Sequence, residues 1–180
     1  DLVLANKEES SRGDVEALIA AGLRVHVSFP CTIAGSVDYL ESLSMLLFGD
    51  EPSPIVAQAR EELASLQAAA PRSLVRVFVP IWKDPWMSFD DRAFASDVLA
   101  HAGLVNVFAD RPRRYPLAAD LGQRPDLAIE TEKDTRYPRF RLEEAIARAP
   151  QVVLLPDEPY RFGEVDANEI LAAAPGAGLR

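Results

Sequence analysis

The sequence predicts an α/β protein that is built from two lobes with parallel sheets. Short continuous apolar runs such as DLVLA and LVRVFV are typical of strands that are covered on both faces. Helical patterns follow these runs, and strands that alternate with helices form parallel sheets. At 32–70, two helical patterns come in succession. This break in the alternation indicates a boundary between the two lobes.

The first lobe begins with two predicted strands, DLVLA at 1–5 and RVHVSF at 24–29. A helix over 12–22 lies between them, because its apolar residues fall on one helical face and Gly22 provides a stop signal. The order strand, helix, strand is the smallest unit of a parallel sheet.

Two helices, over 32–49 and 53–70, follow the second strand. In the later one Pro54 fits the first turn, and apolar residues recur at helical spacing. Because 53–70 contains no glycine and no proline beyond Pro54, we expect one unbroken helix.

The second lobe begins with the strand LVRVFV at 74–79. A helix is predicted over 89–103, with Ser88 as its N-cap and Asp91 three residues further on. Residues 109–140 are rich in Arg, Asp and Pro and form a long excursion, in which DLAIE fits a strand. The remaining predicted elements are a strand at 104–108, a helix at 141–149, a strand at 151–155 and a helix at 164–174.

Composition excludes several classes of protein. The net charge of −9 argues against a binder of nucleic acid or of anionic membrane surfaces. A single cysteine excludes an internal disulfide framework, and no apolar run approaches the roughly 18 residues of a membrane span. No signal peptide is seen. The chain opens on a strand and closes on the loop-like APGAGLR, so we expect a processed chain or a fragment.

An enzymatic function has little support in the sequence motifs. The phosphate-binding and hydrolase signatures GxGxxG, GxxxxGK[ST] and GxSxG do not occur, and two histidines are too few for a usual zinc site. One alternative stays open. Cys31 precedes a predicted helix start, where the helix dipole lowers a thiol pKa, and His26 could serve as its base. A small buried thiol is the simpler interpretation.

Aromatic residues gather in the loops that follow predicted strands. Trp82 and Trp86, the two tryptophans of the chain, lie just after the strand at 74–79, framed by two prolines. Tyr160 follows the strand at 151–155, and Arg136 and Tyr137 lie in the irregular segment TRYP. In parallel sheets, ligands bind beyond the carboxyl ends of strands. These residues therefore either line a ligand cleft or fold back into the lobe core.

The motifs RVFVPIWKDPWM, HAGLVNVFAD and RYPRFRLEEAIARAPQVVLLPDEPYRF resemble the family of periplasmic binding proteins for cobalamin and iron chelates. The resemblance covers essentially the whole chain. It implies a helical-backbone, non-enzymatic substrate-binding protein that captures cobalamin or an iron chelate, such as a siderophore or a haem-like ligand, and delivers it to an ABC importer. The chain then lacks the start of the first lobe and the end of the second.

On this resemblance, 1–31 is the remainder of the first lobe, 32–70 holds the connecting helices with 53–70 as the backbone helix, and 71–180 is the second lobe. Ligand-binding residues are expected at Trp82, Trp86, Tyr137, Tyr160 and Arg136.

Glu143, with Glu144 beside it, is expected to dock on the ABC permease, although an acidic first turn also suits the helix dipole. We expect a monomer with no cofactor, metal site, nucleic-acid partner or membrane segment of its own. The implied location is periplasmic or membrane-anchored outside the cell, while the sequence itself leaves a cytoplasmic one open.

Overall fold

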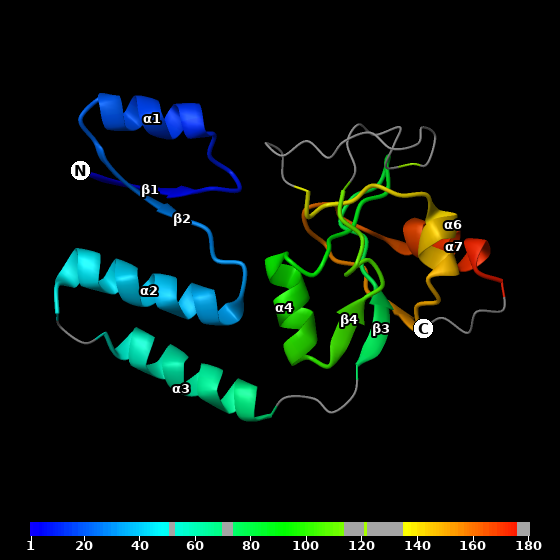
Figure 1. Cartoon of the computed structure of the whole chain (residues 1–180). Helices are drawn as coiled ribbons and strands as arrows, with labels where there is room; N and C mark the ends of the chain where they lie inside the picture. Colours follow the sequence, from blue (N-terminus) through cyan, green and yellow to red (C-terminus); the bar gives the residue numbers. More distant parts are fainter. Residues whose placement is uncertain (51–52, 70–73, 114–120, 122–134, 176–180) are drawn as a thin grey trace. The chain divides into compact units, whose positions relative to one another are not determined.

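The computed structural model describes residues 1–50, 53–69, 74–113, 121 and 135–175 (Figure 1). Contacts within the chain divide it into two compact units, Asp1–Ala64 and Ser65–Arg180. Each unit contains a parallel sheet with helices, which confirms the predicted fold class. The predicted strand within 126–130 lies outside the described residues.

Unit 1, Asp1–Ala64, opens with a strand–helix–strand motif. Strands β1 (Leu2–Asn6) and β2 (Arg24–Ser28) pair in parallel and are connected by α1 (Arg12–Ala20). The Ser11 hydroxyl caps α1 by accepting a hydrogen bond from the Asp14 backbone N–H at 3.1 Å. Gly22 has a φ of +83° after the helix, a conformation that glycine adopts at little cost.

Two helices follow, α2 (Ile33–Phe48) and α3 (Pro54–Ala68). Thr32 caps α2 by accepting from the Gly35 N–H at 2.9 Å. Arg60 of α3 donates to Glu41 and lies 2.7 Å from Asp38, which links the two helices. Helix α3 is continuous, as predicted, and the boundary between the two units falls inside it, after Ala64.

Unit 2, Ser65–Arg180, is organised around a three-stranded parallel sheet. Its strand order is β4–β3–β5, with β3 (Val75–Phe78) in the centre, β4 (Leu104–Asn106) on one side and β5 (Val152–Val153) on the other. Helix α4 (Phe94–His101) connects β3 to β4. Helices α6 (Leu142–Ala147) and α7 (Glu164–Ala173) come before and after β5.

Hydrophobic side chains of unit 2 form two clusters, one on each face of this sheet. Neighbouring residues of β3 separate them, because Val77 and Phe78 point to opposite faces. One cluster joins β3 to α6 and α7 and contains Phe78, Trp86, Val107, Phe108, Phe140, Leu142, Ala145 and Ile170. The other lies on the α4 side and contains Val77, Val79, Phe89 and Ala93. Figure 1 shows α4 on one side of the sheet and α6 and α7 on the other.

The predicted helix at 89–103 is wrong at its start. Helix α4 begins at Phe94, and Ala93 occupies its N-cap position. Ser88 is buried and does not cap the helix: its hydroxyl donates to the Val79 carbonyl at 2.7 Å and accepts from the Asn106 amide at 2.8 Å. The Ser88 side chain therefore forms tertiary hydrogen bonds, although the local sequence pattern predicts it to be a helix cap.

Across the described ranges, the helices are too short or too polar to cross a membrane.

Candidate ligand-binding site

Two loops leave the same edge of the unit 2 sheet. The Trp82 loop (79–88) follows the carboxyl end of β3, and the Tyr160 loop (154–163) follows the carboxyl end of β5. Because β3 and β5 are adjacent and parallel, their carboxyl ends lie side by side. The Trp82 and Tyr160 rings meet edge to face, with centroids 5.8 Å apart and planes at 72°. The structure thus brings together two predicted site residues from segments far apart in the sequence.

The Trp82 loop closes on itself by backbone hydrogen bonds. The Ile81 N–H donates to the Met87 carbonyl at 2.8 Å, and the Met87 N–H donates to the Trp82 carbonyl at 3.0 Å. Trp82 and Met87 form an isolated antiparallel bridge. These bonds fix the backbone on both sides of the tryptophan pair without help from a regular strand.

The two tryptophans lie in different environments. Trp82 is 43% exposed, whereas Trp86 is 9% exposed and belongs to the core cluster on the α6 and α7 side. Trp86 stacks on Phe162 of the Tyr160 loop, with centroids 5.9 Å apart and an interplanar angle of 7°. Tyr160 and Phe162 are themselves in contact, at 4.6 Å between centroids. We call Trp82, Trp86, Tyr160 and Phe162 the ring cluster.

Lys83 connects the Trp82 loop to α7. Its ammonium lies 2.8 Å from Asp166 Oδ1, 2.6 Å from Glu169 Oε2 and 5.4 Å from the centroid of the Trp86 ring. The hydrogen bonds with Asp166 and then Glu169 raise the pKa of Lys83. The bond from Lys83, followed by one from the Gly163 backbone N–H, lowers the pKa of Asp166. Both groups are therefore charged at neutral pH.

Arg136 and Tyr137 lie on a segment that runs beside the end of the Trp82 loop. The Asp90 N–H donates to the Arg136 carbonyl at 2.8 Å, and the Ser88 N–H donates to the Pro138 carbonyl at 3.1 Å. The guanidinium of Arg136 is over the Tyr137 ring at 5.2 Å, and Arg136 is only 6% exposed. Tyr137 is half-buried against the cluster on the α4 side. This pair is thus more enclosed than Trp82.

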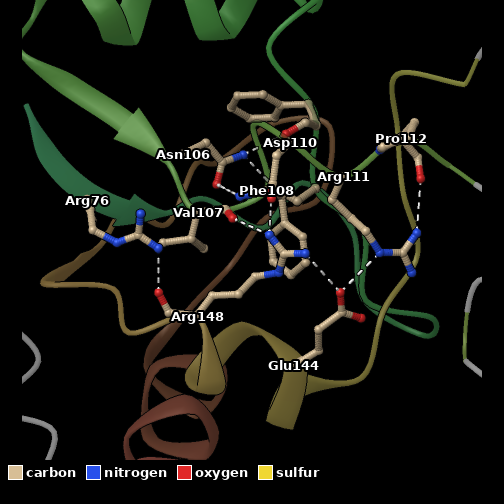
Figure 2. A network of polar contacts seen from close by, with 11 residues as sticks. Arg76, Asn106, Val107, Phe108, Asp110, Arg111, Pro112, Glu144 and Arg148 are labelled. Atoms are coloured by element: carbon tan, nitrogen blue, oxygen red, sulfur yellow. Dashed lines mark hydrogen bonds and ion pairs between the residues drawn. The ribbon is translucent and has the colours of Figure 1, made fainter.

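Glu143 and Glu144 occupy the first turn of α6 but have different surroundings. Glu143 is exposed. Glu144 is half-buried, and its Oε1 lies 3.0 Å from Arg111 Nε and 3.5 Å from an Arg148 nitrogen (Figure 2). Arg148 also donates to the Val107 carbonyl at 2.8 Å, which ties the end of α6 to the end of β4. Glu144 is therefore part of an internal network.

His26 and Cys31 have structural contacts in unit 1. The His26 ring stacks on Tyr39 of α2 with centroids 5.6 Å apart. The Cys31 thiol donates to the Phe29 carbonyl at 3.7 Å, next to Thr32, the residue that caps α2. Neither of these contacts indicates an activated nucleophile.

No protein-family model matches the sequence, and no curated protein matches it. By structure, the chain is similar to the periplasmic vitamin B12-binding protein of Vibrio cholerae, with a TM-score of 0.66 and 19% identity over 99% of this chain and 63% of that one. The chain has the fold of these periplasmic binding proteins.

The same binding-protein fold occurs in other solved structures. A possible iron-binding periplasmic solute-binding protein of Staphylococcus epidermidis gives a TM-score of 0.65 and 17% identity over 98% of this chain and 61% of that chain. A periplasmic heme-binding protein of Pseudomonas aeruginosa gives a TM-score of 0.61 and 18% identity, over 98% of this chain and 58% of that chain. The chain spans about three fifths of the length of these proteins.

Within this binding-protein fold, sequence analysis missed the residues that support the ring cluster. Lys83 and Asp166 have the pattern of solvated charges in their local sequence, and their pairing is visible only in three dimensions. Phe162 lies at the end of the motif LLPDEPYRF, but its stack on Trp86 depends on the pairing of β3 with β5. The one local signal was Asp166, three residues after Gly163 at a helix start, where acids are favoured.

Proposed function

We propose that this protein captures a cobalamin or a ferric chelate and passes it to an ABC importer, without catalysing a reaction. The observation that carries the proposal is the exposed Trp82 ring, held by Tyr160 at the carboxyl edge of a parallel sheet. Ligands bind at this edge in open α/β sheets. The fold shared with structures described as vitamin B12-, iron- and heme-binding proteins supports this class of ligand.

The chemistry of the ring cluster suits a ligand that brings its own metal. Corrinoids, haems and ferric siderophores present flat or aromatic surfaces, against which an indole ring buries area. Among the described residues, no three His, Cys, Asp or Glu side chains gather in a way that could hold a metal ion. We therefore propose that Trp82 and Tyr160 contact the ligand directly, while Trp86 supports them from the core.

Arg136 and Tyr137 remain proposed ligand residues with a smaller accessible surface. Delivery to a permease would use Glu143, the exposed member of the acidic pair at the start of α6. We propose a periplasmic location, because several of the solved structures that share the fold are described as periplasmic.

The two tryptophans provide the test. Trp82→Ala should keep the melting temperature and weaken ligand binding roughly two- to tenfold or more, because aromatic contacts add about 0.5–1.5 kcal/mol beyond area burial. Trp86→Ala should instead lower stability by about 3–5 kcal/mol, as core aromatic truncations do. The measurements are thermal unfolding and fluorescence titration with cyanocobalamin, haemin and a ferric siderophore.

Phe48→Ala is the control, because Phe48 is an exposed aromatic residue at the last position of α2, in unit 1. It should leave ligand affinity unchanged. The proposal is wrong if the parent protein binds none of the three ligand classes, or if Trp82→Ala binds as tightly as the parent.

A further inference from the structure

Lys83 lies between the two tryptophans and reaches out of its own loop to α7. Two carboxylates of that helix receive its ammonium, Asp166 at 2.8 Å and Glu169 at 2.6 Å. The Lys83 and Asp166 side chains are only 15% and 10% exposed. Breaking a nearly buried ion pair leaves an uncompensated charge and costs more than breaking a solvated surface pair, so this pair holds the loop and the helix together.

The same carboxylate organises the start of α7. Asp166 Oδ2 accepts a hydrogen bond from the Gly163 N–H at 2.9 Å, while Oδ1 faces Lys83. Gly163 is the last residue of the Tyr160 loop and the N-cap of α7. Through one side chain, Lys83 is therefore connected to the end of the loop that carries Tyr160 and Phe162.

Ring contacts provide a second connection between the two loops. The Lys83 ammonium lies over Trp86, and Trp86 stacks on Phe162. Trp82 in turn meets Tyr160 edge to face. Since the ammonium is occupied by two carboxylates and a ring, it is not placed to serve an anionic ligand. Its contacts instead join the Trp82 loop to α7.

We infer that Lys83 is a positioning residue: by bridging to Asp166 and Glu169, it holds the Trp82 loop against the Tyr160 loop and presents the Trp82 ring in one orientation. This inference rests on the proposed function, because the orientation matters to a ligand that stacks on Trp82. A ring that is already ordered loses little conformational entropy on binding. Lys83 thus contributes to affinity without touching the ligand.

The first test compares Lys83→Met, Trp82→Ala and the double variant by ligand titration. Lys83→Met should weaken binding roughly two- to tenfold, the cost of ordering one or two side chains on binding. In the Trp82→Ala background, the same change should alter affinity by less than about twofold, because Lys83 acts through Trp82. Additive losses would mean that Lys83 contacts the ligand itself, and unchanged affinity in Lys83→Met would mean that it positions nothing.

A second measurement needs no ligand and so separates this inference from the proposed function. In a Trp86→Phe background, Trp82 is the only tryptophan, and its time-resolved fluorescence anisotropy reports the mobility of the ring. Lys83→Met should make Trp82 more mobile at a temperature where the protein is fully folded. An unchanged anisotropy decay overturns the inference, whatever the ligand titrations show.

Two further variants guard against misfolding and general charge effects. Asp166→Asn removes one of the two carboxylates that pair with Lys83 but keeps an oxygen that can accept from the Gly163 N–H, so the start of α7 is preserved. It should reproduce the increased mobility of Trp82. Arg60→Met is the matched control, because Arg60 also bridges two carboxylates, Asp38 and Glu41, but lies in unit 1. It should change neither the mobility of Trp82 nor the ligand affinity.

Discussion

Trp82 and Trp86 are four positions apart, yet they have different environments. Trp86 is part of a cluster around Phe78, whose ring it meets at 6.5 Å, and its burial stabilises unit 2. Within the part of the chain that the structure describes, Trp82 has one ring neighbour, Tyr160, and it is 43% exposed. A large exposed indole forgoes favourable transfer free energy, which agrees with the proposed contact between Trp82 and a ligand.

The ion pair of Asp166 with Lys83 gives a pH dependence with a definite sign. Because the folded state lowers the pKa of Asp166, this carboxylate stabilises the fold fully above the unfolded value of about 3.9. That stabilisation is lost as the pH falls through the folded pKa. Because the pKa of Lys83 is raised, the lysine stays protonated from neutral pH up to the ordinary lysine pKa, and the ion pair is not lost over this range.

We therefore expect the parent protein to lose more stability than Asp166→Asn between pH 5 and pH 3, values that lie on either side of the ordinary aspartate pKa of about 3.9. Urea unfolding followed at several pH values measures the difference. Glu169→Gln, which changes the more exposed partner of Lys83, should have a smaller effect. Parallel stability profiles for the parent and Asp166→Asn would show that the pair contributes nothing to folding.

At the scale of elements, α6 illustrates how a six-residue helix is held in place. Few hydrogen bonds form within so short a helix, so its position depends on tertiary contacts. Leu142 and Ala145 enter the core, and Arg148 at its end donates to Val107 and Asp110 (Figure 2). The bond from Arg148 lowers the pKa of Asp110.

This arrangement predicts different roles for the two acidic residues of α6. Glu144→Ala should lower the free energy of unfolding by about 1–2 kcal/mol, between the values for exposed and buried pairs, because Arg111 and Arg148 lose a shared carboxylate. Glu143→Lys should leave stability and ligand affinity nearly unchanged. It should slow association with the proposed permease partner, mostly at low salt, as charges on the rim of an interface do.

Thermal unfolding and association kinetics with the permease in detergent or nanodiscs check these expectations. If Glu143→Lys abolishes ligand binding and leaves docking intact, the assignment of Glu143 to docking is wrong.

Elements with strong local signals were predictable from sequence. Gly22 and Pro54 mark helix ends of unit 1 in the structure as in the sequence, and Thr32, where the helix 32–49 was predicted to begin, caps α2. The start of α4 was not predictable in this way, because the hydroxyl of Ser88 bonds to Val79 and Asn106, which lie on other elements. For the site, the aromatic residues that follow two predicted strands indicated the loops that carry the rings. Which tryptophan is exposed, and what Lys83 contacts, depend on long-range packing that one sequence does not encode locally.

At the scale of the whole molecule, the two units differ in how much core they contain. Among the described residues, the buried hydrophobic side chains of unit 1 are Ala5, Val37 and Leu63, whereas unit 2 has thirteen. The sheet of unit 1 has two strands, and Leu4 and Val27 on them remain about half exposed. Two strands with little covered surface are marginally stable.

We expect unit 1 to open at a lower free energy than unit 2. Hydrogen exchange followed by mass spectrometry should show that amides in β1 and β2 exchange through partial opening, while those in β3 and β4 require global unfolding. Val37→Ala, in α2 of unit 1, should speed exchange within unit 1 and leave exchange in β3 and β4 unchanged. Equal opening free energies for both sheets would contradict this expectation and indicate one cooperative fold.

The strand order of unit 2 also determines when its sheet can be completed during translation. The Arg76 N–H in the central strand donates to the side chain of Gln151, 75 positions later in the chain, and β5 pairs with β3 just beyond it. Because the ribosome makes the chain from its N-terminus, β3 and β4 emerge while one edge of β3 has no neighbour. Until Tyr160 and Phe162 have been translated, Trp82 and Trp86 lack these ring partners. The proposed ligand site is therefore among the last features of the described chain to form on a growing polypeptide.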